Sequence, residues 1–164
     1  MKKLLLLLII PFLSFGQDLT YVPDDNFEQY LINAGYDDVL DNYVLTSNIN
    51  TLSYLSIYTA VDQPIFDLTG IKDFTLLQDV SCSSQYLTEI DLSGMFYLKS
   101  ADFSFNYLEC VDVTGCVSLE TLDLEANFLS QIDVSTCISL DWLMCEDNPF
   151  LSCVQIGDND NCCT

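Results

Sequence analysis

A repeated segment constrains the fold of this 164-residue chain more than any other feature. Leu98–Leu108 recurs as Leu119–Leu129, 21 residues later, with Leu, Asn and Leu at matched places. Each copy continues into a second short segment, Val111–Val113 or Ile132–Val134, and then into a Cys. A fixed period of this length is typical of a solenoid, in which every repeat forms one coil and neighbouring coils share a core. We therefore expect a repeat solenoid of the α/β class that is mostly β.

Each coil is expected to bury residues from two short strands, because alternate side chains of a strand share one face. Coils begin at Leu77, Leu98, Leu119 and Leu140, and a longer one is expected over residues 52–76. The inward residues are Val80, Ala101, Leu122, Leu143, Cys82, Phe103, Leu124 and Cys145 on the first strand, and Ile90, Leu92, Val111, Val113, Ile132 and Val134 on the second. One coil alone buries too little to offset the entropy of ordering its backbone, so the coils should fold together.

A side-chain amide recurs at the turn between the two strands of each coil. The residues are Gln85, Asn106, Asn127 and Asn148. A buried amide needs hydrogen-bond partners, and the backbone of the neighbouring coil can supply them. We expect a ladder of amides along the solenoid.

The first 16 residues have the pattern of a secretory signal peptide. Lys2 and Lys3 precede the apolar stretch Leu4–Leu13, and small residues at Ser14 and Gly16 suit cleavage before Gln17. The stretch is too short for an ordinary membrane span. No Cys follows it directly, which argues against a lipoprotein anchor, and an uncleaved N-terminal anchor is the alternative. We expect export, no membrane insertion after cleavage, and a compartment that permits disulfides.

The charge is strongly negative, with 25 acidic and four basic residues and a net charge of −21. Removal of Lys2 and Lys3 would leave 2 − 25 = −23. Such a surface repels nucleic acid and anionic membranes and suits cationic partners or divalent cations. Solubility of an exported protein is an equally simple reason for it. The chain has no His, so the commonest general base and metal ligand is missing.

The segment before the repeats predicts a helix over residues 24–35. Asp24 or Asp25 can cap it, and Gly35 suits its C-terminal end. Its buried face should consist of Phe27, Tyr30, Leu31 and Ala34. Because a solenoid must cover its first apolar cross-section, we expect this helix to serve as an N-terminal cap.

An acidic segment, Asp37–Asn42, follows the predicted helix. It carries four oxygen-bearing side chains within six residues, which could hold calcium. It lacks the alternate-residue spacing of a known calcium loop, so a solvated acidic turn is the other interpretation.

The segment Leu119–Leu129 reads Leu-x-x-Leu-x-Leu-x-x-Asn-x-Leu and resembles the leucine-rich repeat signature. Together with Ile132–Ser135 and Cys137–Leu140, it is similar to the secreted, internalin-like leucine-rich repeat proteins of Bacteroidetes-type bacteria. The entry Val22–Glu28, the phrase Asp67–Gly70 and the exit Asn148–Gln155 look like parts of the same proteins. The resemblance implies a leucine-rich repeat horseshoe of about five coils. Its parts would be a signal peptide (1–16), an N-terminal helical cap (17–51), the repeats (52–156) and a C-terminal tail or cap (157–164).

In the resembled fold, the first strands line a concave sheet whose outward side chains face a partner. The outward residues here are Asp79, Ser81, Ser83, Ser100, Asp102, Ser104, Thr121, Asp123, Glu125, Trp142, Met144 and Glu146. Trp142 beside carboxylates resembles an aromatic binding anchor. It could instead pack against the C-terminal tail as part of a cap.

An acidic residue recurs between the two inward residues of the second strand, at Asp67, Asp91, Asp112 and Asp133. Stacked in register, these carboxylates would repel each other. Exposure, hydrogen bonds to neighbouring Ser and Thr, or a bound calcium ion would each relieve the repulsion.

The eight cysteines allow several arrangements. Cys82 and Cys145 occupy inward positions and should be small core residues. Cys116 and Cys137 share one position in adjacent coils, as stacked free thiols or as a disulfide. A disulfide from Cys153 to Cys162 or Cys163 would clamp the tail over the open end of the solenoid. The dispersed cysteines do not predict a metal site.

These features favour an exported, non-enzymatic binding module without a cofactor, expected to be a monomer. It would bind a protein or glycan through its concave strand face. The alternative is a structural or adhesive cell-surface element stabilised by calcium. A third hypothesis, a glycosidase using Asp102 and Asp123, has two neighbouring carboxylates in its favour but no implied pocket.

Overall fold

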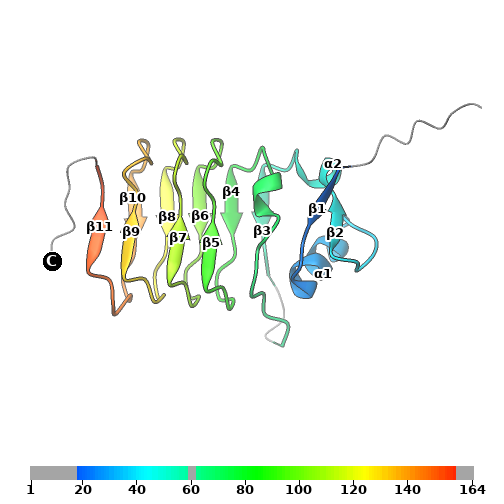
Figure 1. Cartoon of the computed structure of the whole chain (residues 1–164), viewed down its shortest axis with the longest axis horizontal. Coiled ribbons are helices and arrows are strands. Elements are labelled where there is room, and N and C mark those ends of the chain that lie inside the picture. Colours follow the sequence, from blue (N-terminus) through cyan, green and yellow to red (C-terminus); the bar gives the residue numbers. More distant parts are fainter. Residues whose placement is uncertain (1–17, 59–61, 158–164) are drawn as a thin grey trace, which may run out of the picture.

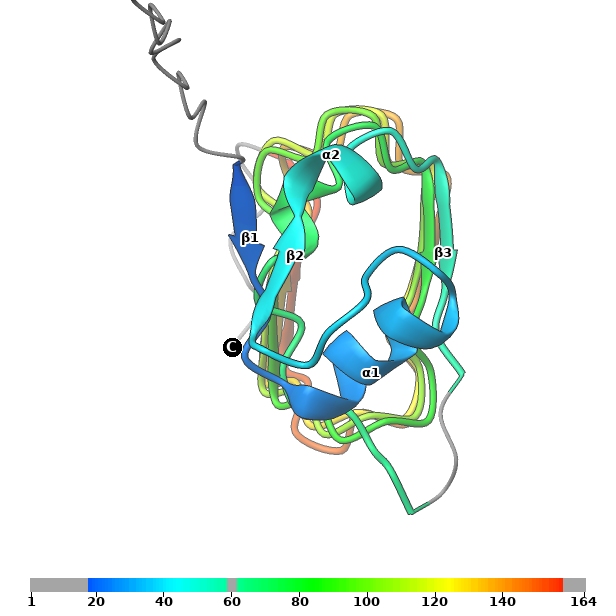
Figure 2. The same cartoon turned by 90° about the vertical axis from the view of Figure 1, so that its right-hand side faces the viewer.

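The chain forms a β-solenoid of about five turns, seen in a computed structural model that describes residues 18–58 and 62–157. Viewed from the side, the coils stand next to one another along the long axis of the molecule (Figure 1). Viewed along that axis, they superimpose as one closed ring with strands on two opposite sides (Figure 2). The solenoid predicted from the 21-residue period is confirmed, whereas horseshoe curvature stays a prediction.

One side of the ring is a five-stranded parallel sheet, in the order β10-β8-β6-β4-β3. Its strands, three residues each, are β3 (Tyr54–Ser56), β4 (Asp79–Ser81), β6 (Ser100–Asp102), β8 (Thr121–Asp123) and β10 (Trp142–Met144). The opposite side has two two-stranded parallel sheets, β5 with β7 and β9 with β11. Their strands are β5 (Glu89–Asp91), β7 (Cys110–Asp112), β9 (Gln131–Asp133) and β11 (Cys153–Gln155).

The register of the five-stranded sheet follows the sequence period. Val80 pairs with Ala101, Ala101 with Leu122, and Leu122 with Leu143. The first three of these residues are at most 2% exposed, whereas Leu143 in the last coil is only partly buried. Equivalent residues therefore lie over one another and form a continuous column in the core.

The second strands bury the predicted residues with one partial exception. Ile90, Leu92, Val113, Ile132 and Val134 are all 5% exposed or less, and Val111 is partly buried. Cys82 is fully buried, as predicted, but Cys145 in the last coil is only half-buried. The last coil lacks the cover of a further described coil on one side, which explains its greater exposure.

The amide ladder is present along the turns. Asn127 accepts a hydrogen bond from the backbone of Leu108 at 2.9 Å and donates to the carbonyl of Phe103 at 3.0 Å, both in the preceding coil. Asn106 and Asn148 bridge their coils in the same way. Gln85 occupies the same place in its coil and accepts from the backbone of Ile65 at 3.0 Å. Each buried amide is thus satisfied by backbone groups of the coil before it.

The N-terminal segment is not part of the repeat. Its elements are β1 (Leu19–Tyr21), α1 (Asp25–Asn33), β2 (Tyr43–Leu45), α2 (Thr46–Ile49) and the short 3-10 helix η1 (Ile71–Asp73). The strands β1 and β2 pair antiparallel, and α1 lies across one end of the ring (Figure 2). The pairing of β1 with β2 and the helix α2 were not expected from the sequence.

Helix α1 matches the predicted helix closely. The Asp24 carboxylate caps it by accepting hydrogen bonds from the backbone of Asn26 and Phe27 at 2.9 and 3.0 Å. Phe27 is fully buried and stacks on Phe74 of the solenoid, with ring centroids 6.4 Å apart. The expected burial of Ala34 is wrong, because Ala34 is the C-cap and lies exposed. The role of helix α1 as the N-terminal cap of the solenoid stays a prediction.

Helix α1 also buries a residue that its apolar spacing does not reveal. Glu28 is 0% exposed, and one carboxylate oxygen accepts hydrogen bonds from the backbone of Asp41 and Tyr43 at 2.9 and 3.1 Å. These bonds fix the acidic segment after the helix, so Glu28 positions the backbone there.

Among the described residues, no helix is long and apolar enough to cross a membrane. The predicted signal peptide and the cysteines Cys162 and Cys163 lie outside the described residues. Export of the protein and a disulfide from Cys153 to Cys162 or Cys163 therefore stay predictions.

Candidate binding surfaces

The outward side chains of the five-stranded sheet form two aligned rows, which we call the strand face. The first row runs Tyr54, Asp79, Ser100, Thr121 and Trp142, and the second runs Ser56, Ser81, Asp102, Asp123 and Met144. Parallel pairing in register places equivalent residues about 4.8 Å apart, so each row is about 19 Å long. Nine outward residues were predicted to bind a ligand. Eight of them lie in these rows, namely Asp79, Ser81, Ser100, Asp102, Thr121, Asp123, Trp142 and Met144, and the ninth, Glu125, lies just beyond β8.

The carboxylates of the strand face differ in how they are bonded. Asp102 accepts hydrogen bonds from the hydroxyls of Ser104 at 2.7 Å and Ser81 at 3.1 Å. Asp123 accepts one from the backbone of Glu125 at 3.0 Å. Within the described part of the chain, the second oxygen of Asp123 accepts no hydrogen bond and could meet a ligand. Ser104, which was expected to face outward, is 7% exposed.

Large aromatic side chains stand at both ends of the first row. Tyr54 is 62% exposed in β3, and Trp142 is 70% exposed in β10. The C-terminal tail from residue 158 on lies outside the described residues, so the anchor interpretation of Trp142 stays a prediction. Tyr54 was not predicted to lie on this face. It directly precedes the inward residue Leu55, just as Asp79 directly precedes the inward residue Val80.

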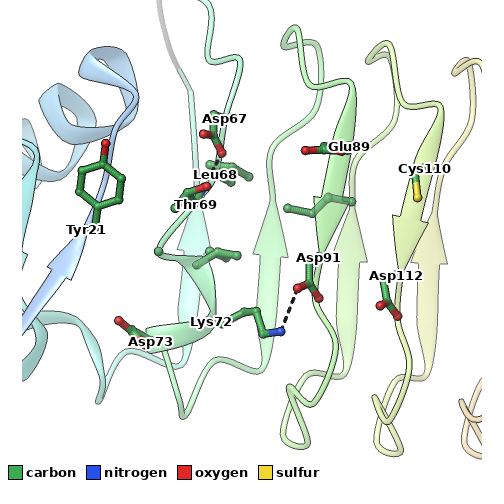
Figure 3. A pocket seen from close by; sticks show the side chains of 13 residues that line it. Tyr21, Asp67, Leu68, Thr69, Lys72, Asp73, Glu89, Asp91, Cys110 and Asp112 are labelled. Atoms are coloured by element: carbon green, nitrogen blue, oxygen red, sulfur yellow. Dashed lines mark hydrogen bonds and ion pairs between the residues drawn. The ribbon is translucent and has the colours of Figure 1, made fainter.

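A groove lies on the opposite side of the ring from the strand face, along β5 and β7 (Figure 3). Its volume is about 500 Å³. The lining combines Tyr21 of β1, residues of η1 and acidic side chains of the second strands. Lys72 reaches across it to Asp91 with a nitrogen-to-oxygen distance of 2.9 Å (Figure 3). The groove was not predicted from the sequence, because it forms where the irregular first coil meets the regular ones.

Three carboxylates of the predicted acidic ladder, those of Asp67, Asp91 and Asp112, line the groove, and all four are hydrogen-bonded. Asp67, Asp91, Asp112 and Asp133 each accept a bond of 2.7 to 2.9 Å from the backbone two residues later. Partial burial raises the pKa of Asp91, but bonds from Ser93 and Lys72 outweigh it, so this pKa lies below its ordinary value. Bonds from Ser135 lower the pKa of Asp133. The carboxylates thus tolerate their spacing through exposure and local hydrogen bonds.

Residues 18–58 and 62–157 contain no group of three or more His, Cys, Asp or Glu side chains that could hold a metal ion. In the acidic segment Asp37–Asn42, the pKa of Asp37 lies above its ordinary value. Burial raises it, and the neighbouring charges of Asp38 and Asp41 add to the effect.

Two buried thiols stack in adjacent coils. Cys116 and Cys137 are 0% and 5% exposed and are both free. Their sulfurs lie 3.1 and 3.5 Å from the carbonyls of Leu92 and Val113 in the preceding coils. Burial, reinforced by the nearby Cys137, raises the pKa of Cys116 to about 11. Of the two arrangements left open by the sequence, the structure has the free thiols.

A third surface feature is a line of five neighbouring aromatic rings, which we call the aromatic stripe. It consists of Phe66, Tyr86, Tyr107, Phe128 and Phe150. Successive ring centroids are 5.4, 5.2, 5.8 and 6.4 Å apart. The aromatic stripe was not predicted from the sequence, although Tyr86, Tyr107 and Phe128 each follow the ladder amide directly.

No model of a known protein family matches the chain, and no curated protein matches it. Among solved structures, it is similar to the "functional domain of InlJ from Listeria monocytogenes", which includes a cysteine ladder. The sequence identity is 20%, the TM-score is 0.49, and the match covers 84% of this chain. It spans only 38% of the InlJ structure. A neighbour this distant leaves the function of the chain to be inferred from its own surfaces.

Proposed function

We propose that the protein is an exported, non-enzymatic repeat module that binds a partner protein through its strand face. The observation that carries this proposal is the register of the five-stranded sheet, which aligns ten outward residues of five coils into one continuous surface. The side chains of both rows are at least partly exposed. A solenoid holds such rows rigidly, so a partner would find its contacts already arranged.

The favoured partner presents basic side chains. Asp79, Asp102 and Asp123 lie on the strand face, and the outward positions of its strands carry no Lys or Arg. With a net charge of −21, the whole chain attracts cationic surfaces and speeds their approach. Trp142 and Tyr54 supply exposed aromatic surface at the two ends of the first row, and Trp and Tyr are enriched among the residues that contribute most to binding energy.

An array of proteins and glycans, probed with the mature chain, tests the proposal. The variant Asp102→Asn/Asp123→Asn is compared with Asp112→Asn/Asp133→Asn, which removes the same two charges from the opposite side of the ring. We expect the first variant to weaken binding of a basic protein at least tenfold, about 1.4 kcal/mol, and the second to change it less. Fluorescence of Trp142, the only tryptophan, should change on binding.

Equal loss in both variants would show that net charge rather than the strand face governs binding. Hydrolysis of a polysaccharide that disappears in Asp123→Asn would replace the proposal by the glycosidase hypothesis.

The second candidate is a structural or adhesive surface element stabilised by calcium. The observation in its favour is the row of exposed carboxylates, in which Asp91 pairs in register with Asp112. Thermal melts with calcium and with a chelator, at low ionic strength, separate the candidates. Identical curves would exclude stabilisation by calcium.

A further inference from the structure

The aromatic stripe is an exposed apolar feature that the proposed function does not use. Its five rings are between 42% and 64% exposed. They lie at the turn between the two sides of the ring, away from the outward rows of the five-stranded sheet. One aromatic residue per coil makes the stripe a single ring wide and five rings long.

The backbone forces these rings to point outward. Tyr107 lies between Asn106 and Leu108, which are 4% and 0% exposed, so its own side chain must leave the core. Its backbone N–H donates to the carbonyl of Leu87 in the preceding coil at 2.9 Å, which fixes its register. The same bond is made by Phe128 to Leu108. The stripe is therefore a rigid array whose period is that of the solenoid.

The exposed apolar area of the stripe is as large as a functional patch. An aromatic side chain offers 150–250 Å², and about half of each ring is exposed, so the stripe presents roughly 400–600 Å². The largest apolar patch on a typical monomer is about 300–600 Å² and is often functional. The stacking of the coils explains the spacing of the rings and their outward direction, but not why these exposed positions carry aromatic residues.

We propose that the aromatic stripe binds a neutral, linear glycan, which lies along the solenoid axis and contacts successive coils. A chain of repeating sugar units matches a narrow, straight and periodic row of rings. Sugar rings present electropositive C–H groups, and aromatic faces carry a negative quadrupole that attracts them. This site and its ligand are independent of the proposed protein-binding strand face.

The surroundings of the stripe select a neutral ligand. No Lys or Arg occurs in the segments 65–67, 84–88, 105–109, 126–130 and 147–152, which carry the five rings, and their only acidic residues are Asp67, Glu109 and Asp147. Exposed hydroxyls of Thr88, Ser130 and Ser152 border the stripe two residues beyond its rings and can bond to sugar hydroxyls. The net charge of −21 repels acidic glycans and anionic membranes.

Other occupants fit less well. A stable dimer needs about 800 Å² from each copy, more than the stripe offers, and two copies would each bring a charge of −21. An added peptide strand needs free backbone donors, but the N–H groups of Tyr86, Tyr107 and Phe128 already donate to the preceding coils.

Affinity electrophoresis and calorimetry with cellohexaose, xylohexaose and mixed-linkage β-glucan test the proposal, with polygalacturonate as the acidic probe. We expect the wild-type protein to bind at least one neutral probe and not polygalacturonate. Tyr107→Ser/Phe128→Ser should weaken that binding at least tenfold, and Tyr107→Phe should retain it. The matched control is Phe96→Ser/Tyr97→Ser, which removes two rings that are 60% and 58% exposed at the other turn of a coil. It should leave binding unchanged.

Circular dichroism first establishes that each variant is folded, and Tyr86→Ser replaces the double variant if that variant is not. The proposal is overturned if no neutral probe binds the wild-type protein, or if the stripe and control variants bind alike. It is also overturned if light scattering shows a dimer that the stripe variant dissociates while no glycan binds. Asp102→Asn/Asp123→Asn, on the strand face, should leave glycan binding intact, so the two proposals can fail separately.

Discussion

At the scale of single residues, Gly70 shows how one backbone position joins the N-terminal segment to the solenoid. Its φ is +100°, a left-handed conformation that glycine adopts readily. A Cβ atom there would lie 2.7 Å from the backbone oxygen of Tyr21 and 3.0 Å from a methyl carbon of Thr20. Only the absence of a side chain lets β1 approach so closely.

We predict that Gly70→Ala lowers the free energy of unfolding by about 2 kcal/mol more than Gly94→Ala, measured by urea denaturation. Both substitutions place Ala at positive φ, but Gly94 has no atom within 4 Å of its added Cβ. The difference between the variants therefore isolates the clash with β1. Equal losses would mean that β1 moves away at little cost.

At the scale of the structural elements, the strands are too short to hold the solenoid by themselves. Each has three residues, and a strand of that length makes few ladder hydrogen bonds. The buried amides add bonds at the turns, where the strands have ended. The side-chain amide of Asn127, for example, forms hydrogen bonds with backbone groups of three residues, Leu108, Phe103 and Leu124.

Asn127→Ala should cost about 2–4 kcal/mol of stability, because the N–H of Leu108 and the carbonyl of Phe103 would lose a buried partner. Equilibrium unfolding in urea measures the loss. Asn33→Ala, at the exposed end of α1, is the matched control and should cost less than about 0.5 kcal/mol. A loss for Asn127→Ala as small as that of the control would show that water replaces the amide.

At the scale of the whole molecule, the core is one cluster that runs from Val22 to Cys137. Leu122 lies inside it, fully buried between Ala101 and Leu143 of the adjacent strands. No coil has a separate core, so a substitution that unfolds one coil should also unfold the others.

Leu122→Asp should therefore unfold most of the protein rather than one coil. The lost burial and the unpaired buried charge each cost several kcal/mol, against a total stability of about 5–15 kcal/mol for a domain. Far-UV circular dichroism and hydrogen exchange measure the extent of unfolding. Thr121→Asp, which places the same side chain on the outward face of β8, should stay folded. A cooperative melt of Leu122→Asp near the wild-type temperature would contradict the prediction.

The sequence by itself determined the periodic part of this protein. A period of 21 residues and alternate apolar residues specify which side chains of each coil enter the core, and they place Asn106 and Asn127 at equivalent turns. These predictions hold because equivalent residues make the same contact in every coil. The pattern of apolar residues within one coil therefore also predicts which residues of adjacent coils touch.

The tertiary structure alone decided the features that join unlike segments. The burial of Glu28, the close approach of β1 to Gly70, and the groove between η1 and β5 depend on contacts between residues that no period relates. The aromatic stripe was not predicted, although Tyr86, Tyr107 and Phe128 recur every 21 residues, because the contacts and the exposure of its rings depend on the turn geometry. Local patterns encode which face of a strand is apolar, whereas the surfaces available to a partner depend on where the chain brings distant segments together.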